Sequence, residues 1–116
     1  MNRIPPLITA VTETLRHNTR VIMGDKLRKI ILYGSYARGD YKDYSDLDIM
    51  VLADIAEDEK KIFEHQIDEV ASDIGLDHDI IVSVMLNNEN LFMSRLHLSP
   101  YYRNVLAEGV EIYAAH

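Results

Sequence analysis

Apolar residues recur at helical spacing in two long segments of the chain. The first follows Pro5-Pro6, which suit a helix start, and extends to about Met23, where Gly24-Asp25 ends it. The second has charged residues between its apolar positions and ends at Gly75, where we expect a left-handed cap. Its apolar positions are Phe63, Ile67, Val70, Ala71 and Ile74. The sequence therefore predicts two amphipathic helices.

Three β-rich segments, residues 29–33, 46–53 and 78–86, predict strands. The middle segment is apolar on both faces beyond its acidic start, which is typical of a central strand. One face carries Leu47, Ile49 and Val51, and the other carries Asp48, Met50 and Leu52. Residues 36–44 lack periodicity and predict a helical turn followed by a loop.

The C-terminal part predicts two short helices and a last short strand. Asn87-Asn88 can cap the first helix, and Ser99-Pro100 begins the second, which Gly109 closes. Residues 110–113 then form the strand. No internal repeat or linker interrupts the chain, and 116 residues suffice for one core. We therefore expect residues 1–116 to form a single domain, without room for a separate substrate-binding domain.

Composition narrows the classes of function. The formal charge of −7 opposes binding to nucleic acid, whose affinity for proteins comes mainly from neutralised phosphates. Cysteine is absent, which excludes disulfides, thiolate metal sites and a cysteine nucleophile. No apolar run resembles a signal peptide or reaches the length that spans a bilayer. We expect a cytoplasmic protein that binds neither nucleic acid nor membrane.

A turn and a pair of carboxylates carry the most distinctive chemistry. Gly34 lets a phosphate approach the backbone, and Ser35 adds a hydroxyl and N–H groups that attract anions. Asp46 and Asp48, if they lie on a strand, leave the same face about 6.6 Å apart at Cα. Carboxylates at this spacing can bind one divalent ion or bridge the two ions of a phosphoryl-transfer site. The pattern favours a magnesium–phosphate site over a solvated sheet face.

Two polar residues beside this pattern are further candidates. Arg38 follows Ser35 by three positions, so it can reach a phosphate oxygen or pair on the surface with Asp40 or Asp43. Ser45 can bind the terminal phosphate or cap the loop. The sequence leaves both alternatives open.

A third carboxylate would complete a two-metal site by orienting or partly deprotonating an attacking hydroxyl. Asp79 is the first candidate, because it opens a β-rich segment as Asp46 and Asp48 do. Asp77 would share its face and remains a rival. Tyr36, Tyr41 and Tyr44 flank the predicted site and can stack on a base, contact a partner or accept a modification.

The motif resembles the nucleotidyltransferase superfamily that includes DNA polymerase beta and kanamycin nucleotidyltransferase. The resemblance rests on Gly34-Ser35, ten intervening residues, Asp46-x-Asp48 and a later acidic residue at the head of a strand. Within the superfamily, Gly34-Ser-x-Ala-Arg-Gly39 and the run from Tyr101 to Tyr113 are similar to the minimal nucleotidyltransferase (MNT) group. This resemblance implies a single domain of the α/β (α+β) class, in which helices flank a small mixed sheet.

The resemblance also implies roles and partners. Asp46, Asp48 and Asp79 would hold two Mg²⁺ ions, with Asp79 as the base. ATP would bind at Gly34, Ser35, Arg38 and Ser45. Members of the minimal group are often antitoxins that attach AMP to a tyrosine of a HEPN-domain RNase toxin. Two alternatives stay open: a nucleotidyltransferase for a small hydroxyl compound such as an antibiotic, and an antitoxin that acts by binding alone.

Overall fold

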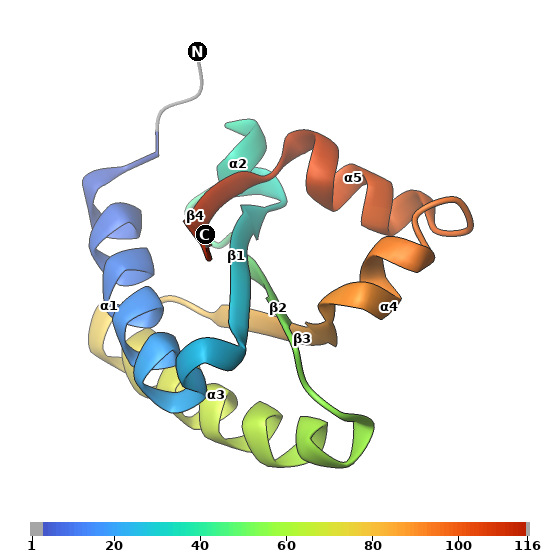
Figure 1. The fold of residues 1–116 in the computed structure, drawn as a ribbon. Helices are drawn as coiled ribbons and strands as arrows, with labels where there is room; N and C mark the ends of the chain where they lie inside the picture. The colour runs from blue at the N-terminus through green and yellow to red at the C-terminus, as the bar shows by residue number, and fades with distance from the viewer. Residues whose placement is uncertain (1–3, 116) are drawn as a thin grey trace.

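The computed structural model describes residues 4–115, which form a four-stranded sheet with helices on both faces (Figure 1). The sheet has the order β3-β2-β1-β4. Its strands are β1 (Leu27–Tyr33), β2 (Leu47–Ala53), β3 (Val82–Asn88) and β4 (Val110–Ala114). β2 and β3 run parallel, whereas β1 is antiparallel to both β2 and β4. The mixed sheet of the expected α/β class is thus confirmed.

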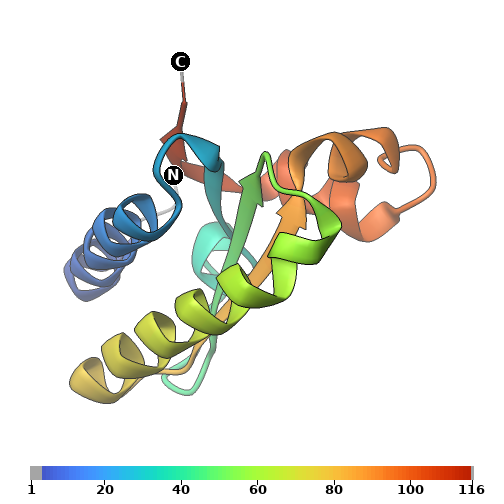
Figure 2. The same ribbon diagram turned by 60° about the horizontal axis from the view of Figure 1, so that its bottom comes forward.

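The helices lie in two groups on opposite faces of the sheet. They are α1 (Pro6–Met23), the 3₁₀ turn η1 (Gly24–Lys26), α2 (Ser35–Arg38), α3 (Glu57–His78), α4 (Glu89–Ser94) and α5 (Pro100–Glu108). α1 and α3 cover one face, and α4 and α5 cover the other (Figures 1 and 2). The predicted caps of α4 and α5 are confirmed, since Asn88 Oδ1 and Ser99 Oγ accept hydrogen bonds from backbone N–H groups.

The helix–strand junction after α3 differs from the sequence prediction. α3 continues past Gly75 to His78, and Asp79 is the residue in the left-handed conformation, with φ 54°. A Cβ on Gly75 would lie 2.5 Å from the Ile80 carbonyl oxygen, so glycine serves close packing here and does not end the helix. β3 consequently begins at Val82 and not at residue 78.

Two clusters of buried side chains hold the helices to the sheet. The first joins α1 and α3 to alternate residues of β2, including Leu47, Ile49 and Val51. The second lies under α4 and α5 and includes Met50, Leu52, Phe92 and Val105. The alternation predicted for the middle strand is therefore confirmed, and it orients Asp48 toward the face that carries α4 and α5.

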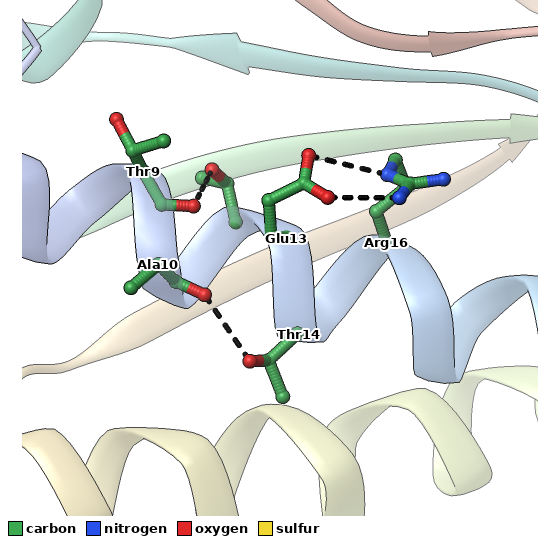
Figure 3. Close-up of polar contacts among 6 residues, drawn as sticks. Thr9, Ala10, Glu13, Thr14 and Arg16 are labelled. Carbon is green, nitrogen blue, oxygen red and sulfur yellow. Dashed lines mark hydrogen bonds and ion pairs between the residues drawn. The ribbon is translucent and has the colours of Figure 1, made fainter.

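The exposed side of α1 carries several polar contacts within the helix. Arg16 Nη2 donates to Glu13 Oε2 at 2.8 Å, and Thr14 Oγ1 donates to the Ala10 carbonyl at 3.1 Å (Figure 3). These are exposed contacts within one helix, which contribute little to stability. Among the described residues, no helix combines the length and apolar character needed to cross a membrane.

Replacing Phe92 tests the second cluster. Its side chain is 1% exposed and stacks on Tyr102 with a ring-centroid distance of 4.3 Å. We expect Phe92→Ala to lower the free energy of unfolding by about 3–5 kcal/mol because it leaves a cavity. The neighbouring Met93→Ala, at a position 45% exposed, should change it by less than about 1 kcal/mol. Urea denaturation measures both, and equal losses would contradict the described packing.

Candidate functional site

All the predicted site residues except Asp79 line one hollow of about 580 Å³. They are Gly34, Ser35, Arg38, Ser45, Asp46 and Asp48. The hollow lies between the end of β1, the start of α2, the loop before β2 and one side of α5. Segments that are distant in the sequence thus converge at one end of the sheet.

The backbone of Gly34 lies close to the Asp48 carboxylate in this hollow. Gly34 follows β1 with φ 77° and ψ −155°, a conformation that is essentially restricted to glycine. A Cβ at this position would lie 2.3 Å from Asp48 Oδ2. The antiparallel register, which pairs Tyr33 with Asp48, causes this approach. Glycine is therefore required both for the backbone and for room beside the carboxylate.

Arg38 is held at the rim by two carboxylates. Its Nε donates to Asp40 Oδ2 at 3.2 Å, and its Nη1 donates to Glu108 Oε1 at 3.0 Å. The hydrogen bond to Asp40, followed by that to Glu108, raises the pKa of Arg38. The pairing with Asp40 that the sequence left open does form, and the side chain also lines the hollow.

Ser45 orders the loop that precedes the two carboxylates. Its Oγ accepts a hydrogen bond from the Lys42 N–H at 2.8 Å, which is the capping role of the two alternatives. Ser45 also lines the hollow. The loop cap and a contact with a ligand are compatible.

Asp46 and Asp48 give the hollow a negative charge that no cation of the described residues neutralises, since Arg38 is paired with Asp40 and Glu108. Burial, followed by the charge of Asp46, raises the pKa of Asp48, and Arg38 opposes this shift. A cation between the carboxylates would remove their repulsion, and carboxylate oxygens are the ligands that Mg²⁺ prefers. The donor set of Asp46 and Asp48 therefore fits a divalent ion.

Asp79 does not join these carboxylates. It lies on the turn after α3 and lines a second hollow of about 380 Å³, which adjoins the first through Tyr44, Ser45 and Asp46. Within residues 4–115, no three acidic or histidine side chains are grouped to hold a metal ion. The expected set of three is thus not assembled, because α3 is longer than predicted. The rival, Asp77, is exposed on the last turn of α3.

The sequence prediction missed the wall that α5 provides. Tyr101, Asn104 and Glu108 line the hollow. Their helical spacing predicts a common face of α5, but it does not predict that this face lies against the turn at Gly34. The hydroxyl groups of Tyr33 and Tyr101 are hydrogen bonded, and burial is the main cause that raises the pKa of Tyr33. Of the flanking tyrosines, Tyr44 lines the hollow and is 85% exposed.

Comparison with protein families identifies the fold and the class of enzyme. The family described as "Nucleotidyltransferase domain" matches residues 18–112. The chain belongs to this nucleotidyltransferase family. It is similar to a candidate protein adenylyltransferase from Methanocaldococcus jannaschii, with 36% identity over 76% of this chain and 80% of the relative. A second candidate protein adenylyltransferase of that organism is 32% identical over 72% of this chain and 83% of its own length.

Solved structures share the fold of this nucleotidyltransferase. A chain of a toxin–antitoxin crystal structure with AMP-PNP has a TM-score of 0.55 and 22% identity, covering 97% of this chain and 76% of its own. A chain from the complex of a tri-AMPylated Shewanella oneidensis HEPN toxin with an MNT antitoxin has a TM-score of 0.53 and 20% identity, covering 91% and 71%. A candidate nucleotidyltransferase from Sulfolobus solfataricus has a TM-score of 0.53 and 16% identity, covering 98% and 92%.

Gly34→Ala tests the contact with Asp48. The added Cβ would displace the carboxylate, so we expect the loss of magnesium-dependent ATP binding in isothermal titration calorimetry. Gly24→Ala is the matched control, because Gly24 also has a positive φ of 57° but its added Cβ meets no atom closer than 4.0 Å. It should cost about 1–3 kcal/mol of stability through backbone strain and leave ATP binding intact. Equal binding by the two variants would contradict this account.

The raised pKa of Asp48 predicts a pH-dependent stability. In metal-free protein the folded state keeps the Asp48 proton to higher pH than the unfolded state, so stability falls as pH rises through this interval. Asp48→Asn removes the charge and should raise the unfolding temperature at neutral pH. The gain should vanish below the ordinary carboxyl pKa, where Asp48 is protonated in both states. Thermal unfolding in EDTA measures it, with Asp73→Asn on α3 as a surface control.

Proposed function

We propose that this nucleotidyltransferase transfers AMP from ATP to a tyrosine hydroxyl of a HEPN-domain RNase toxin, and so acts as an antitoxin. The observation that carries the proposal is the convergence of Gly34, Ser35, Asp46 and Asp48 on one hollow. Two relatives named as candidate protein adenylyltransferases support protein as the acceptor. The complexes among the structural neighbours support a HEPN toxin as the partner.

The residues of the hollow divide the work of binding ATP. The backbone at Gly34 and the hydroxyl of Ser35 receive the phosphates, and Ser45 lies within the same hollow. Arg38 adds a positive charge at the rim, held in place by Glu108. Asp46 and Asp48 would hold Mg²⁺, which neutralises phosphate charge and orients the triphosphate when it is bound.

The transfer exchanges one bond to the α-phosphorus for another. The tyrosine oxygen forms the new bond to the α-phosphorus, the bond to the bridging oxygen breaks, and diphosphate leaves. The phenolic proton passes from the acceptor to the solvent. The chain's contribution is to fix the triphosphate against the turn at Gly34, so that one face of the α-phosphate stays open to the acceptor.

The exposed side of the hollow supports a protein acceptor. Tyr44 is 85% exposed at its edge, and Asp46 lies exposed beside it. A docked protein that covers these residues would limit the access of bulk water to the reacting groups. The formal charge of −7 favours a partner with a basic surface and opposes nucleic acid as a direct ligand.

Labelled ATP tests the proposal directly. The chain is incubated with Mg²⁺, α-labelled ATP and a candidate HEPN-domain partner from the same organism, and the label on the partner is measured. Asp46→Asn and Asp48→Asn should each reduce labelling by at least about 100-fold, because each removes a charge that the transition state requires. Asp79→Asn is the matched control, and it should keep most of the activity because Asp79 lines the other hollow.

The same assay separates the two alternatives. If the Asp46→Ala, Asp48→Ala double variant neutralises the toxin as well as the unmodified chain does, binding alone explains the antitoxin effect. Label on an aminoglycoside, with none on protein, would favour a small hydroxyl compound as the acceptor. Either result would overturn transfer to the toxin as the basis of neutralisation.

A further inference from the structure

Ser83 occupies the position on β3 directly beside Asp48. The parallel pairing of β2 with β3 places Leu47 opposite Val82 and Asp48 opposite Ser83. Residues paired in this way have Cα atoms about 4.8 Å apart and side chains on the same face. Because β3 is the edge strand, no further strand lies beyond Ser83 within the described residues. Ser83 is therefore the nearest β3 neighbour of a carboxylate that the proposed chemistry uses.

Packing on both sides of the sheet supports this orientation. Val82 and Val84 pack against the cluster under α1 and α3, so the intervening Ser83 faces the other side. Further along the same face, Asn87 Nδ2 lies 3.3 Å from Met50 Sδ. A slip of one residue would reverse both sets of contacts. The serine hydroxyl thus stands on the face from which Asp48 projects.

The ionisable groups around Ser83 either make other contacts or lie in the adjoining hollow. Asp46 and Asp48 are the proposed Mg²⁺ ligands, and on the far wall Arg38 pairs with Glu108 and Tyr33 with Tyr101. Toward α3, the adjoining hollow carries Asp43, Tyr44 and Asp79. Glu108 is the third carboxylate of the hollow that Asp46 and Asp48 line, and its hydrogen bond to Arg38 occupies it. In the part of the chain that the structure describes, no three acidic or histidine side chains are grouped to hold a metal ion. At the position beside Asp48, β3 carries the Ser83 hydroxyl and not a carboxylate that could act as a general base.

The chemistry of the acceptor determines how much such a base matters. A positioned general base typically contributes about 10²–10⁴-fold to a rate. An aliphatic alcohol gives up its proton very reluctantly and depends on that help. A phenol, with a pKa of about 10, is far more acidic and reaches its nucleophilic form more easily without it. A site without a carboxylate base would therefore select acidic hydroxyl groups.

We propose that this chain has no general base beside Asp48, where β3 carries Ser83. The acidity of the acceptor hydroxyl then decides which groups the chain modifies. The inference rests on the proposed AMP transfer. The acceptor oxygen bonds to the α-phosphorus, diphosphate leaves with the electrons of the broken bond, and the acceptor proton passes to water. Selection for tyrosine over serine and threonine then follows from the nucleophile's own chemistry.

Three small acceptors test the proposal on the full chain. N-acetyltyrosinamide, its 3-fluoro derivative and N-acetylserinamide are each supplied in excess with ATP and Mg²⁺ at one neutral pH, and the AMP adduct is measured by mass spectrometry. The tyrosine compound should exceed the serine compound by about 100-fold or more, the scale of a missing base. The fluorinated phenol, which ionises at lower pH, should react faster than the unmodified one. Equal rates for tyrosine and serine would overturn the inference.

Ser83→Asp introduces a carboxylate at this position, and Ser83→Asn is the control of similar size without charge. We expect Ser83→Asp to raise the serine rate by at least about tenfold relative to Ser83→Asn, since a base contributes on that scale or above. A serine rate that is the same in both variants, with ATP binding intact by calorimetry, would overturn the inference and leave AMP transfer standing. Absence of every small adduct while a HEPN-domain partner is labelled would overturn the inference alone, and absence of both products despite ATP binding would overturn AMP transfer as well.

Discussion

The site depends on the approach of the Gly34 backbone to the Asp48 carboxylate. This contact exists only while β1 and β2 keep the register that pairs Tyr33 with Asp48. A shift of one residue would turn Asp48 to the opposite face of the sheet. The register is fixed by burial, because the residues that alternate with Asp48 lie in the core under α1 and α3. Core packing on one face thus positions the chemistry on the other.

The same contact has a cost for the free protein. Asp48 is partly removed from water and lies near Asp46, so its charged form is disfavoured. Such strain is common where a site must bind a cation and a polyphosphate, since the ligand relieves it. The buried sheet supplies the compensating stability: the side chains of Ile30, Leu32, Ile49 and Val51 are fully buried. The fold therefore holds an unfavourable charge where ligands can use it.

α5 completes the site from a distant part of the chain. Arg38 reaches Glu108, 70 positions further along, and Tyr33 reaches Tyr101, 68 positions further along. The anchor of α5 is its packing in the second cluster, where Val105 is buried. Two polar contacts thus join the phosphate-binding turn to a helix that the second hydrophobic cluster holds in place. The polar residues line the hollow, and the apolar ones determine where it is.

Local signals in the sequence determined much of this protein. Pro5-Pro6, Asn88 and Ser99 set helix starts, the alternation of β2 determined its two buried faces, and the Gly34–Asp48 motif identified the family. These succeed because capping and alternation act over a few neighbouring residues. The prediction that Gly75 ends the helix was wrong, because Gly75 allows close packing against the Ile80 carbonyl. The neighbouring residues in the sequence do not reveal this contact.

Only the tertiary structure decided which acidic and hydroxyl groups meet. The sequence predicted Asp79 as the neighbour of Asp46 and Asp48, yet the parallel register places Ser83, four positions later, beside Asp48. The sequence likewise did not predict that α5 forms a wall of the hollow, although the spacing of its residues predicts that they share one helical face. Strand register and helix docking arise from contacts between distant segments, and one chain read alone does not specify those contacts.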